Sequence, residues 1–209
     1  APDSLPAIYE DYGCINFLKA GIHVADAANT VSPGYAREIK ESSNGPRLAP
    51  AINAKGERFR GILNGADYDT WSPEKDGLIP TSYSIKDMAG KITCKIHLQR
   101  RFHVEENPRI ALIGFIGRLA WQKGVHLLRA VVERVVTDMV AQAVILGSGD
   151  PEFEEYFRTL PAGYPGKIGT YVGFHDELAH LVEAGADFLV MPSLYEPCGL
   201  NQMYSLRYG

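Results

Sequence analysis

The sequence predicts an α/β protein in which a Rossmann-like parallel sheet carries helices on both faces. Between residues 109 and 206, short apolar segments alternate with segments whose apolar residues recur at helical spacing. Such alternation is typical of βαβ units, which build parallel sheets. The strand segments are apolar throughout instead of alternating with polar residues, which indicates a sheet covered on both faces.

The elements expected in this second half follow in chain order. We expect strands at 109–117 (RIALIGFIG), 141–146 (AQAVIL), 167–174 and 187–191 (DFLVM), the last of them buried. We expect helices at 124–136, 151–160, 176–184 and 200–206. The second of these helices has proline in its first turn, where the missing N–H costs nothing.

The first half is less regular. A helix is expected over 15–25 and a short strand over 27–31. Ser32-Pro33 predicts another helix start, because serine is a good N-cap and proline suits the first helical position. Segment 42–56 is polar and contains glycine and proline, so we interpret it as a loop.

A second break at 64–76 is rich in Asn, Gly, Asp and Pro, which indicates a domain boundary. Residues 1–66 would then be the end of one domain, and residues 67–209 most of another. A helix over 85–102 would lead into the second domain. Only four clear strands follow residue 109, so we expect the natural protein to continue beyond Gly209.

Composition excludes several classes of function. Hydrophobic residues make up 45% and charged residues 22% of the 209 residues, which is ordinary for a globular protein. A net charge of -4 does not indicate a nucleic-acid partner. No apolar run approaches the roughly 20 residues that cross a bilayer, so we expect no membrane partner. The three cysteines form no CxxC pair and the six histidines are scattered, so we expect no metal site.

Candidate site residues lie just after the strands, because ligands of open α/β sheets bind beyond the carboxyl ends of the strands. Gly117-Arg118 and Lys123 follow the first strand of the second half. Two cations at this position suit a diphosphate leaving group, on which charge builds as the bond to it breaks. The alternative is a pair of solvated surface cations.

Two more segments follow the next strands. Gly147-Ser148-Gly149 would let a ligand approach the backbone closely, although a simple tight turn is the alternative. The pattern is not GxGxxG, which weakens a nicotinamide-dinucleotide interpretation. Phe174 could stack on a base, and its alternative is an ordinary core aromatic.

The fourth segment joins the last strand to the last helix. It places Glu196 before Cys198, Gly199, Leu200 and Asn201 at a helix start, where free backbone amides bind anions. A carboxylate there would repel phosphate, but it could accept hydrogen bonds from sugar hydroxyls. The alternative is a helix-capping carboxylate.

Taken together, these segments resemble the bacterial and plant glycogen/starch synthase family of retaining glucosyltransferases. The resemblance depends on FIGRL with QKG at 115–124, LGSGDP at 146–151, AGAD at 184–187, MPS at 191–193 and EPCGLNQ at 196–202. It extends into the first half through NFLKAG at 16–21, TVSP at 30–33 with YAREI at 35–39, and LNG at 63–65. Segment 42–60 is its weakest part.

The resemblance implies a two-domain GT-B fold and transfer of glucose from ADP-glucose to an α-1,4-glucan. Arg118 and Lys123 would neutralise the diphosphate, and Glu196 would hold the transferred glucose. Phe174 would stack on adenine, and Asn64 would face the acceptor. The donor is a substrate, so no cofactor and no metal are implied. The compartment would be the plastid stroma in a plant or alga and the cytoplasm in a bacterium, with the protein soluble in either.

The chain departs from the family pattern at several points. Ala66 and Tyr195 replace the usual Ile and Phe, which are tolerable changes. The N-terminal Lys-x-Gly-Gly loop, the histidine of the first domain and the later Thr-Gly-Gly turn are absent, so we expect this chain alone to be inactive. The alternatives are another retaining nucleotide-sugar glycosyltransferase and a non-catalytic paralogue that binds ADP or glucan.

Overall fold

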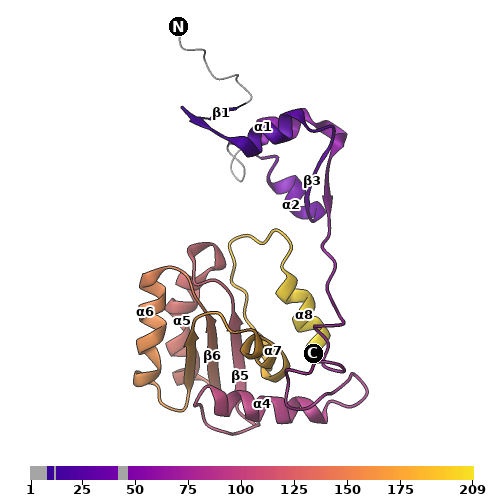
Figure 1. Ribbon diagram of the computed structural model, residues 1–209. Coiled ribbons are helices and arrows are strands. Elements are labelled where there is room, and N and C mark those ends of the chain that lie inside the picture. Colours follow the sequence, from indigo (N-terminus) through magenta and orange to yellow (C-terminus); the bar gives the residue numbers. More distant parts are fainter. Residues whose placement is uncertain (1–8, 12, 42–46) are drawn as a thin grey trace. The chain divides into compact units, whose positions relative to one another are not determined.

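A computed structural model describes residues 9–11, 13–41 and 47–209 of the chain (Figure 1). These residues pack as two compact units. The first contains the described residues up to Gly65 together with Glu196–Cys198, and the second contains Ala66–Tyr195 and Gly199–Gly209. Each unit is considered by itself.

The first unit is small and carries two short sheets. Its strands are β1 (Glu10–Asp11), β2 (Cys14–Ile15), β3 (Ala28–Val31) and β4 (Phe59–Ile62). β1 and β2 are antiparallel, whereas β3 and β4 are parallel. Its helices are α1 (Phe17–Val24), α2 (Pro33–Glu38), α3 (Ala49–Ala54) and the 3-10 turn η1 (Gly56–Arg58). The predicted start of α2 is confirmed, since the Ser32 hydroxyl accepts a hydrogen bond from the Tyr35 N–H at 3.0 Å.

The expectation of a loop over 42–56 is wrong for its second part. α3 forms there and buries Ala49, Ala51 and Ile52. Ile52 joins Ala36 and Phe59 in a small core. A helix of six residues has too few positions to show a helical period, so tertiary packing decides its formation. Residues 42–46 of the expected loop lie outside the described residues.

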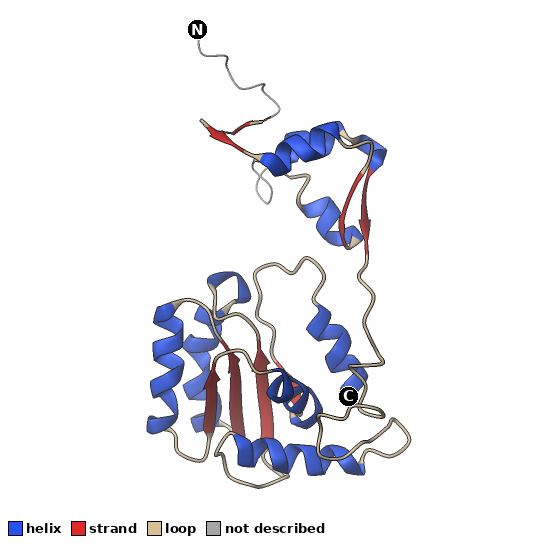
Figure 2. Ribbon diagram, in the orientation of Figure 1, coloured by secondary structure: helices blue, strands red, loops and turns tan. Residues whose placement is uncertain are grey.

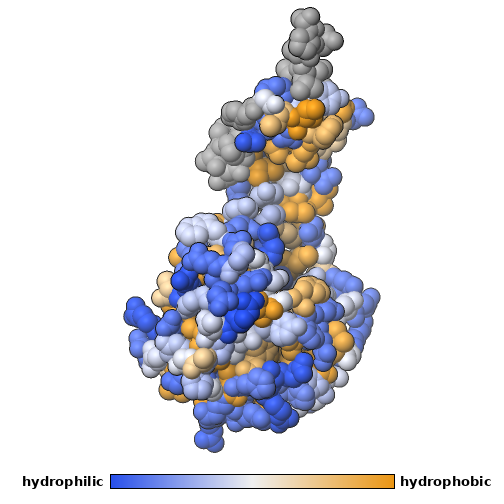
Figure 3. Space-filling view, turned by 60° about the vertical axis from the view of Figure 1, so that its left-hand side comes forward, coloured by the Kyte–Doolittle hydropathy of each residue, from blue (hydrophilic) through white to orange (hydrophobic). Residues whose placement is uncertain are grey.

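The first unit also exposes large apolar side chains. Figure 3 shows apolar surface on this unit. Exposed large apolar side chains belong to β2, α1, β4 and the segment after β4. They are Ile15, Phe17, Leu18, Val24, Ile62 and Leu63. Exposed apolar surface that gathers in one place is typical of interaction sites.

The second unit is the predicted parallel α/β sheet with helices on both faces (Figure 2). Its four-stranded sheet has the order β7-β6-β5-β8, and every neighbouring pair is parallel. The strands are β5 (Ala111–Ile116), β6 (Ala141–Gly147), β7 (Ile168–Val172) and β8 (Phe188–Leu189). The helices are α4 (Ala89–Arg101), η2 (Trp121–Lys123), α5 (Val125–Asp138), α6 (Pro151–Thr159), η3 (Leu160–Gly163), α7 (Asp176–Gly185) and α8 (Leu200–Tyr208).

Two apolar cores lie on opposite faces of this sheet. Residues of α5 and α6 pack on one face against Phe115, Ala143 and Ile145. Residues of α4 and α7 pack on the other face against Val144 and Leu146. Neighbouring residues of a strand point to opposite faces, so apolar residues at successive positions fill both cores.

Two predicted elements differ from the structure in their extent or burial. The strand expected over 187–191 is reduced to β8, and its Phe188 is 62% exposed instead of buried. β8 is the last strand in the sheet order and pairs with β5, so one of its sides has no neighbouring strand in the described sheet. The helix expected from residue 85 begins at Ala89, because Ser84 and Asp87 form a backbone turn before it.

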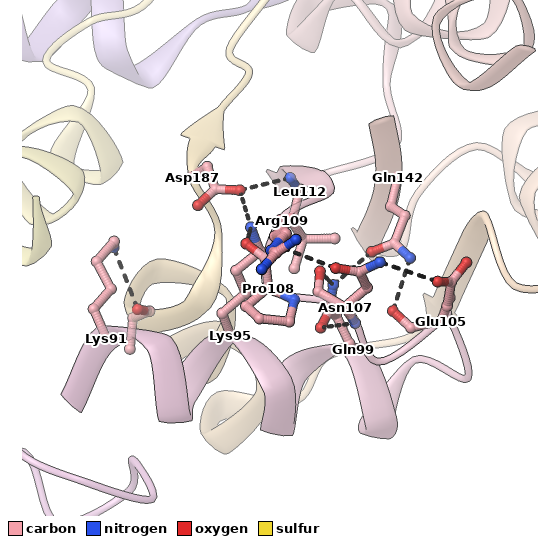
Figure 4. A network of polar contacts seen from close by, with 11 residues as sticks. Lys91, Lys95, Gln99, Glu105, Asn107, Pro108, Arg109, Leu112, Gln142 and Asp187 are labelled. Atoms are coloured by element: carbon pink, nitrogen blue, oxygen red, sulfur yellow. Dashed lines mark hydrogen bonds and ion pairs between the residues drawn. The ribbon is translucent and has the colours of Figure 1, made fainter. Parts of the chain in front are cut away.

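A polar network joins α4 to the amino-terminal ends of the strands (Figure 4). The Lys95 ammonium donates to Asp187 at 2.5 Å, and the same carboxylate oxygen accepts from the Leu112 N–H at 2.7 Å. Beside it, the buried Gln99 donates its side-chain N–H to the buried Gln142 at 2.8 Å. These contacts hold the helix against the end of the sheet that is opposite the predicted ligand site.

None of the helices in the described ranges is long and apolar enough to cross a membrane.

Candidate functional site

A pocket opens at the carboxyl ends of β5, β6 and β7 in the second unit. Its volume is about 260 Å³. Six of the residues that the sequence singled out line it: Gly117, Arg118, Gly147, Ser148, Phe174 and Asn201. The pocket lies where ligands of open parallel sheets bind.

Other lining residues were not among the candidate site residues. They are Ile116, Leu146, Gly173, His175 and Ala179. Most of them end a strand or begin the following loop, so position after a strand was the signal that could have identified them. His175 also caps α7, since its Nδ1 accepts a hydrogen bond from the Leu178 N–H at 3.3 Å.

Glycine is required at two positions, the end of β6 and the β6–α6 loop, by the neighbouring backbone. A Cβ atom on Gly147 would lie 2.0 Å from the Gly117 carbonyl oxygen, and one on Gly149 would lie 2.4 Å from the Leu119 oxygen. The close approach continues the β5–β6 pairing into the loops, where the Leu119 N–H donates to the Ser148 oxygen at 2.9 Å. Packing between two loops therefore explains both glycines without a ligand. Gly147 lines the pocket, whereas Gly149 does not.

The two predicted cations lie in the β5–α5 connection. Arg118 is exposed, lines the pocket and donates from Nη2 to the Gln122 side-chain oxygen at 2.8 Å. Lys123 ends the η2 turn and is not a lining residue. Gly124 follows with a left-handed backbone (φ 68°), and a Cβ there would lie 1.9 Å from the Pro192 oxygen. This glycine lets the β8–α8 loop pack against the start of α5.

The start of α8 also contributes to the pocket. Gly199 is its N-cap with φ 74°, and Leu200 is the first helical residue. The Asn201 side chain lines the pocket and donates to the Ile116 carbonyl oxygen at 3.2 Å, which links α8 to the end of β5. Gly199 and Leu200 themselves are not lining residues.

Three predicted site residues belong to the first unit. They are Asn64, Glu196 and Cys198. None of them lines the pocket.

Phe174 lies at the rim of the pocket with its ring 88% exposed. It follows Gly173, whose φ of 152° lies outside the range that other residues commonly adopt. Because Phe174 is exposed, the alternative that it is an ordinary core aromatic is wrong, and its ring is open to a planar ligand.

A buried carboxyl lies between α7 and α8. Glu183 of α7 is 5% exposed and accepts a hydrogen bond from the Ser205 hydroxyl of α8 at 2.8 Å. Burial raises the pKa of Glu183 from 4.5 to about 7, although the Ser205 hydrogen bond and the charge of Lys91 act in the opposite direction. Across residues 9–11, 13–41 and 47–209, no group of His, Cys, Asp and Glu could hold a metal ion.

Comparison with known proteins shows what this chain is similar to. Residues 2–54 match the model of the starch synthase catalytic domain, and residues 111–209 match that of glycosyl transferases group 1. A glycogen synthase from Myxococcus xanthus is 48% identical over 200 residues, which cover 96% of this chain and 42% of that protein. Glycogen synthase 1 from Geobacter sulfurreducens is 46% identical over 93% of this chain and 38% of its own length. Glycogen synthases are therefore homologues of this chain over most of its length.

Solved structures agree with this similarity. The catalytic domain of starch synthase IV from Arabidopsis thaliana, bound to ADP and acarbose, superposes with a TM-score of 0.88 at 33% identity. That comparison covers 93% of this chain and 40% of the synthase domain. Sucrose-phosphate synthase from Thermosynechococcus elongatus shares the GT-B fold at 17% identity and a TM-score of 0.57. The chain therefore spans about two fifths of the length of the relatives it matches.

Proposed function

We propose that the full-length protein transfers glucose from ADP-glucose to the non-reducing end of an α-1,4-glucan with retention of configuration. The observation that carries the proposal is the pocket at the carboxyl end of the parallel sheet, to which Arg118 contributes a cation and Phe174 an exposed ring. The lining residues that the structure describes include no carboxylate. Such a pocket suits an anionic nucleotide, and a starch synthase of the same fold binds ADP.

The chemistry needs the leaving diphosphate to be stabilised. The bond between the anomeric carbon and the diphosphate breaks with its electron pair going to ADP. The hydroxyl oxygen of the acceptor then bonds to that carbon and releases its proton. Negative charge on the diphosphate grows along this path, so nearby cations favour the transition state over the ground state. We assign this role to Arg118, which can grip phosphate oxygens with two N–H groups, and to Lys123.

The remaining predicted residues receive roles of positioning. Phe174 would stack on the adenine, and the backbone of Gly117, Gly147 and Ser148 would border the phosphates. Asn201 holds the start of α8 to β5, and we propose that Gly199 and Leu200 direct backbone amides toward the anion. Glu196 and Cys198 would contact the glucose, and Asn64 would contact the acceptor. A bacterial source would place the enzyme in the cytoplasm and a plant source in the plastid.

Substitution of each cation in the full-length protein tests the proposal. We expect Arg118→Ala and Lys123→Ala each to lower the incorporation of labelled glucose into glycogen about 100-fold or more, the scale of losing one transition-state stabiliser. The dissociation constant of the donor ADP-glucose should rise much less, because its diphosphate carries less negative charge before the bond breaks than in the transition state. Normal turnover in either variant would contradict the assignment. ADP binding without turnover in the wild-type protein would favour a non-catalytic paralogue.

Glu196→Gln separates sugar binding from helix capping. Glutamine keeps the shape and one acceptor of glutamate but removes the charge, which matters most when the anomeric carbon becomes cation-like. We expect turnover to fall while ADP still binds. Unchanged turnover with a lowered melting temperature would assign Glu196 to the helix cap.

A further inference from the structure

Gln122 lies between Arg118 and Lys123 in the sequence and connects two loops of the second unit. Its side-chain Oε1 accepts a hydrogen bond from Arg118 Nη2 at 2.8 Å. Its Nε2 donates to the Tyr195 carbonyl oxygen, also at 2.8 Å. Its backbone oxygen accepts from the Leu194 N–H at 2.9 Å. The β5–α5 connection is thereby joined to the β8–α8 loop, 73 residues further along the chain.

The two side-chain contacts require a primary amide. The Arg118 guanidinium has only donors, and the Tyr195 carbonyl has only acceptor capacity. A group between them must accept at one atom and donate at the other, which an amide does. An ionised glutamate could only accept, and a methionine of similar length offers no strong donor or acceptor.

The hydrogen bond to Gln122 restrains the flexible side chain of Arg118. An arginine side chain that is free in solution loses about 2 kcal/mol of rotamer entropy when a ligand fixes it. The hydrogen bond uses one of the five N–H groups of the Arg118 guanidinium, so its other N–H groups can still bind phosphate. A guanidinium that is already held loses less of this entropy when the donor binds.

We propose that Gln122 is a positioning residue of the transferase, which holds the Arg118 guanidinium in the donor pocket and fixes it to the loop that leads into Glu196. The inference rests on the proposed function, because Gln122 acts through Arg118. It assigns no contact between Gln122 and the substrate.

A double-mutant cycle in the full-length protein tests this role. We expect Gln122→Met to lower kcat about 10-fold, because misplacement of a catalytic group by about 1 Å can cost up to about 100-fold in rate. Its ADP dissociation constant should rise by a smaller factor than kcat falls, because the remaining contacts of the nucleotide are kept. Leu127→Ala, an exposed side chain in the first turns of α5, is the control and should leave kcat unchanged.

The coupling between the two residues is the decisive readout. If Gln122 acts through Arg118, Gln122→Met should have no further effect on kcat in an Arg118→Ala background. Multiplicative losses in the double variant would overturn the inference and indicate a general effect on loop structure. Normal kcat in Gln122→Met beside an impaired Arg118→Ala would also overturn it while leaving the proposed function intact. Normal kcat in Arg118→Ala would instead refute the proposed function.

A second variant covers the case in which Gln122→Met does not fold. Gln122→Glu keeps the side-chain shape and the acceptor for Arg118, but its charge pairs with the guanidinium and it cannot donate to Tyr195. We expect a loss of kcat at least as large as that of Gln122→Met, because the new carboxylate occupies the guanidinium and the bond to Tyr195 is lost. Wild-type kcat in Gln122→Glu would overturn the positioning role.

Discussion

The buried carboxyl of Glu183 makes the stability of the second unit depend on pH. The groups around it are the Ser205 hydroxyl, the Lys91 ammonium and the phenols of Tyr83, Tyr204 and Tyr208. Burial favours the neutral acid, so the folded chain holds this proton to about pH 7, whereas the ordinary pKa is 4.5. The folded state therefore binds more protons than the unfolded state between these values, and the free energy of unfolding falls as pH rises through them.

The size of the effect follows from the two pKa values. Each unit of separation corresponds to about 1.4 kcal/mol, so a pKa raised from 4.5 to about 7 predicts a contribution of about 3 kcal/mol. This contribution is fully present below pH 4.5 and is lost by about pH 7 to 8. Glu183→Gln should remove it, because glutamine can still accept the Ser205 hydrogen bond but does not ionise. The variant should then match the wild type at pH 4.5 and exceed its stability by about 3 kcal/mol at pH 8.

Urea unfolding followed by tryptophan fluorescence measures this dependence. Trp71 is a suitable reporter, because its ring stacks on His180 of α7 and on Tyr204 of α8. Glu177→Gln, on the exposed face of α7, is the matched control and should keep the wild-type pH dependence. Parallel curves for the wild type and Glu183→Gln between pH 4.5 and pH 8 would refute the reasoning.

Three further changes have expected outcomes that follow from the structure or from the proposed chemistry. Gln99→Leu should lower the free energy of unfolding, measured in urea, by about 2–4 kcal/mol. The buried side-chain oxygen of Gln142 and the backbone N–H of Asn107 would both lose their hydrogen-bond partner. Gly147→Ala should cost about 1–3 kcal/mol, because its Cβ would overlap a carbonyl oxygen, whereas Gly163→Ala meets nothing within 4 Å and should change stability by less than about 0.5 kcal/mol. A chelator should leave most transferase activity of the full-length protein intact, since side-chain cations and helix amides neutralise the diphosphate; complete loss that magnesium or manganese restores would contradict this.

The sheet of the second unit could be predicted from the sequence because its signals are local. β5, β6 and β7 are apolar runs that end in glycine or a polar turn, and they form within about two residues of the expected bounds. The exposure of Phe188 could not be predicted in this way, because DFLVM has the composition of a buried strand. Its exposure depends on the place of β8 at the end of the strand order, which the sequence of the segment does not contain.

The sequence predicted part of the pocket lining but not the hydrogen bonds that connect its loops. Position after a strand identified Arg118, Gly147 and Phe174 as lining residues. The role of Gln122 was not visible, because its side-chain donor meets a carbonyl group 73 residues away. The neighbouring loop supplies a reason for Gly147 and Gly149 that does not involve a ligand.

The same close packing explains how loops can form a precise site. The β5–α5 connection is hydrogen-bonded to the β6–α6 loop through Leu119 and Ser148, and to the β8–α8 loop through Gln122 and Tyr195. Asn201 adds a bond between α8 and the end of β5. Loops that are bonded to one another in this way lose few degrees of freedom when an anion binds. A site that depends on cations and backbone amides needs such rigidity, because its electrostatic effect requires the donors to be in place before charge develops on the leaving group.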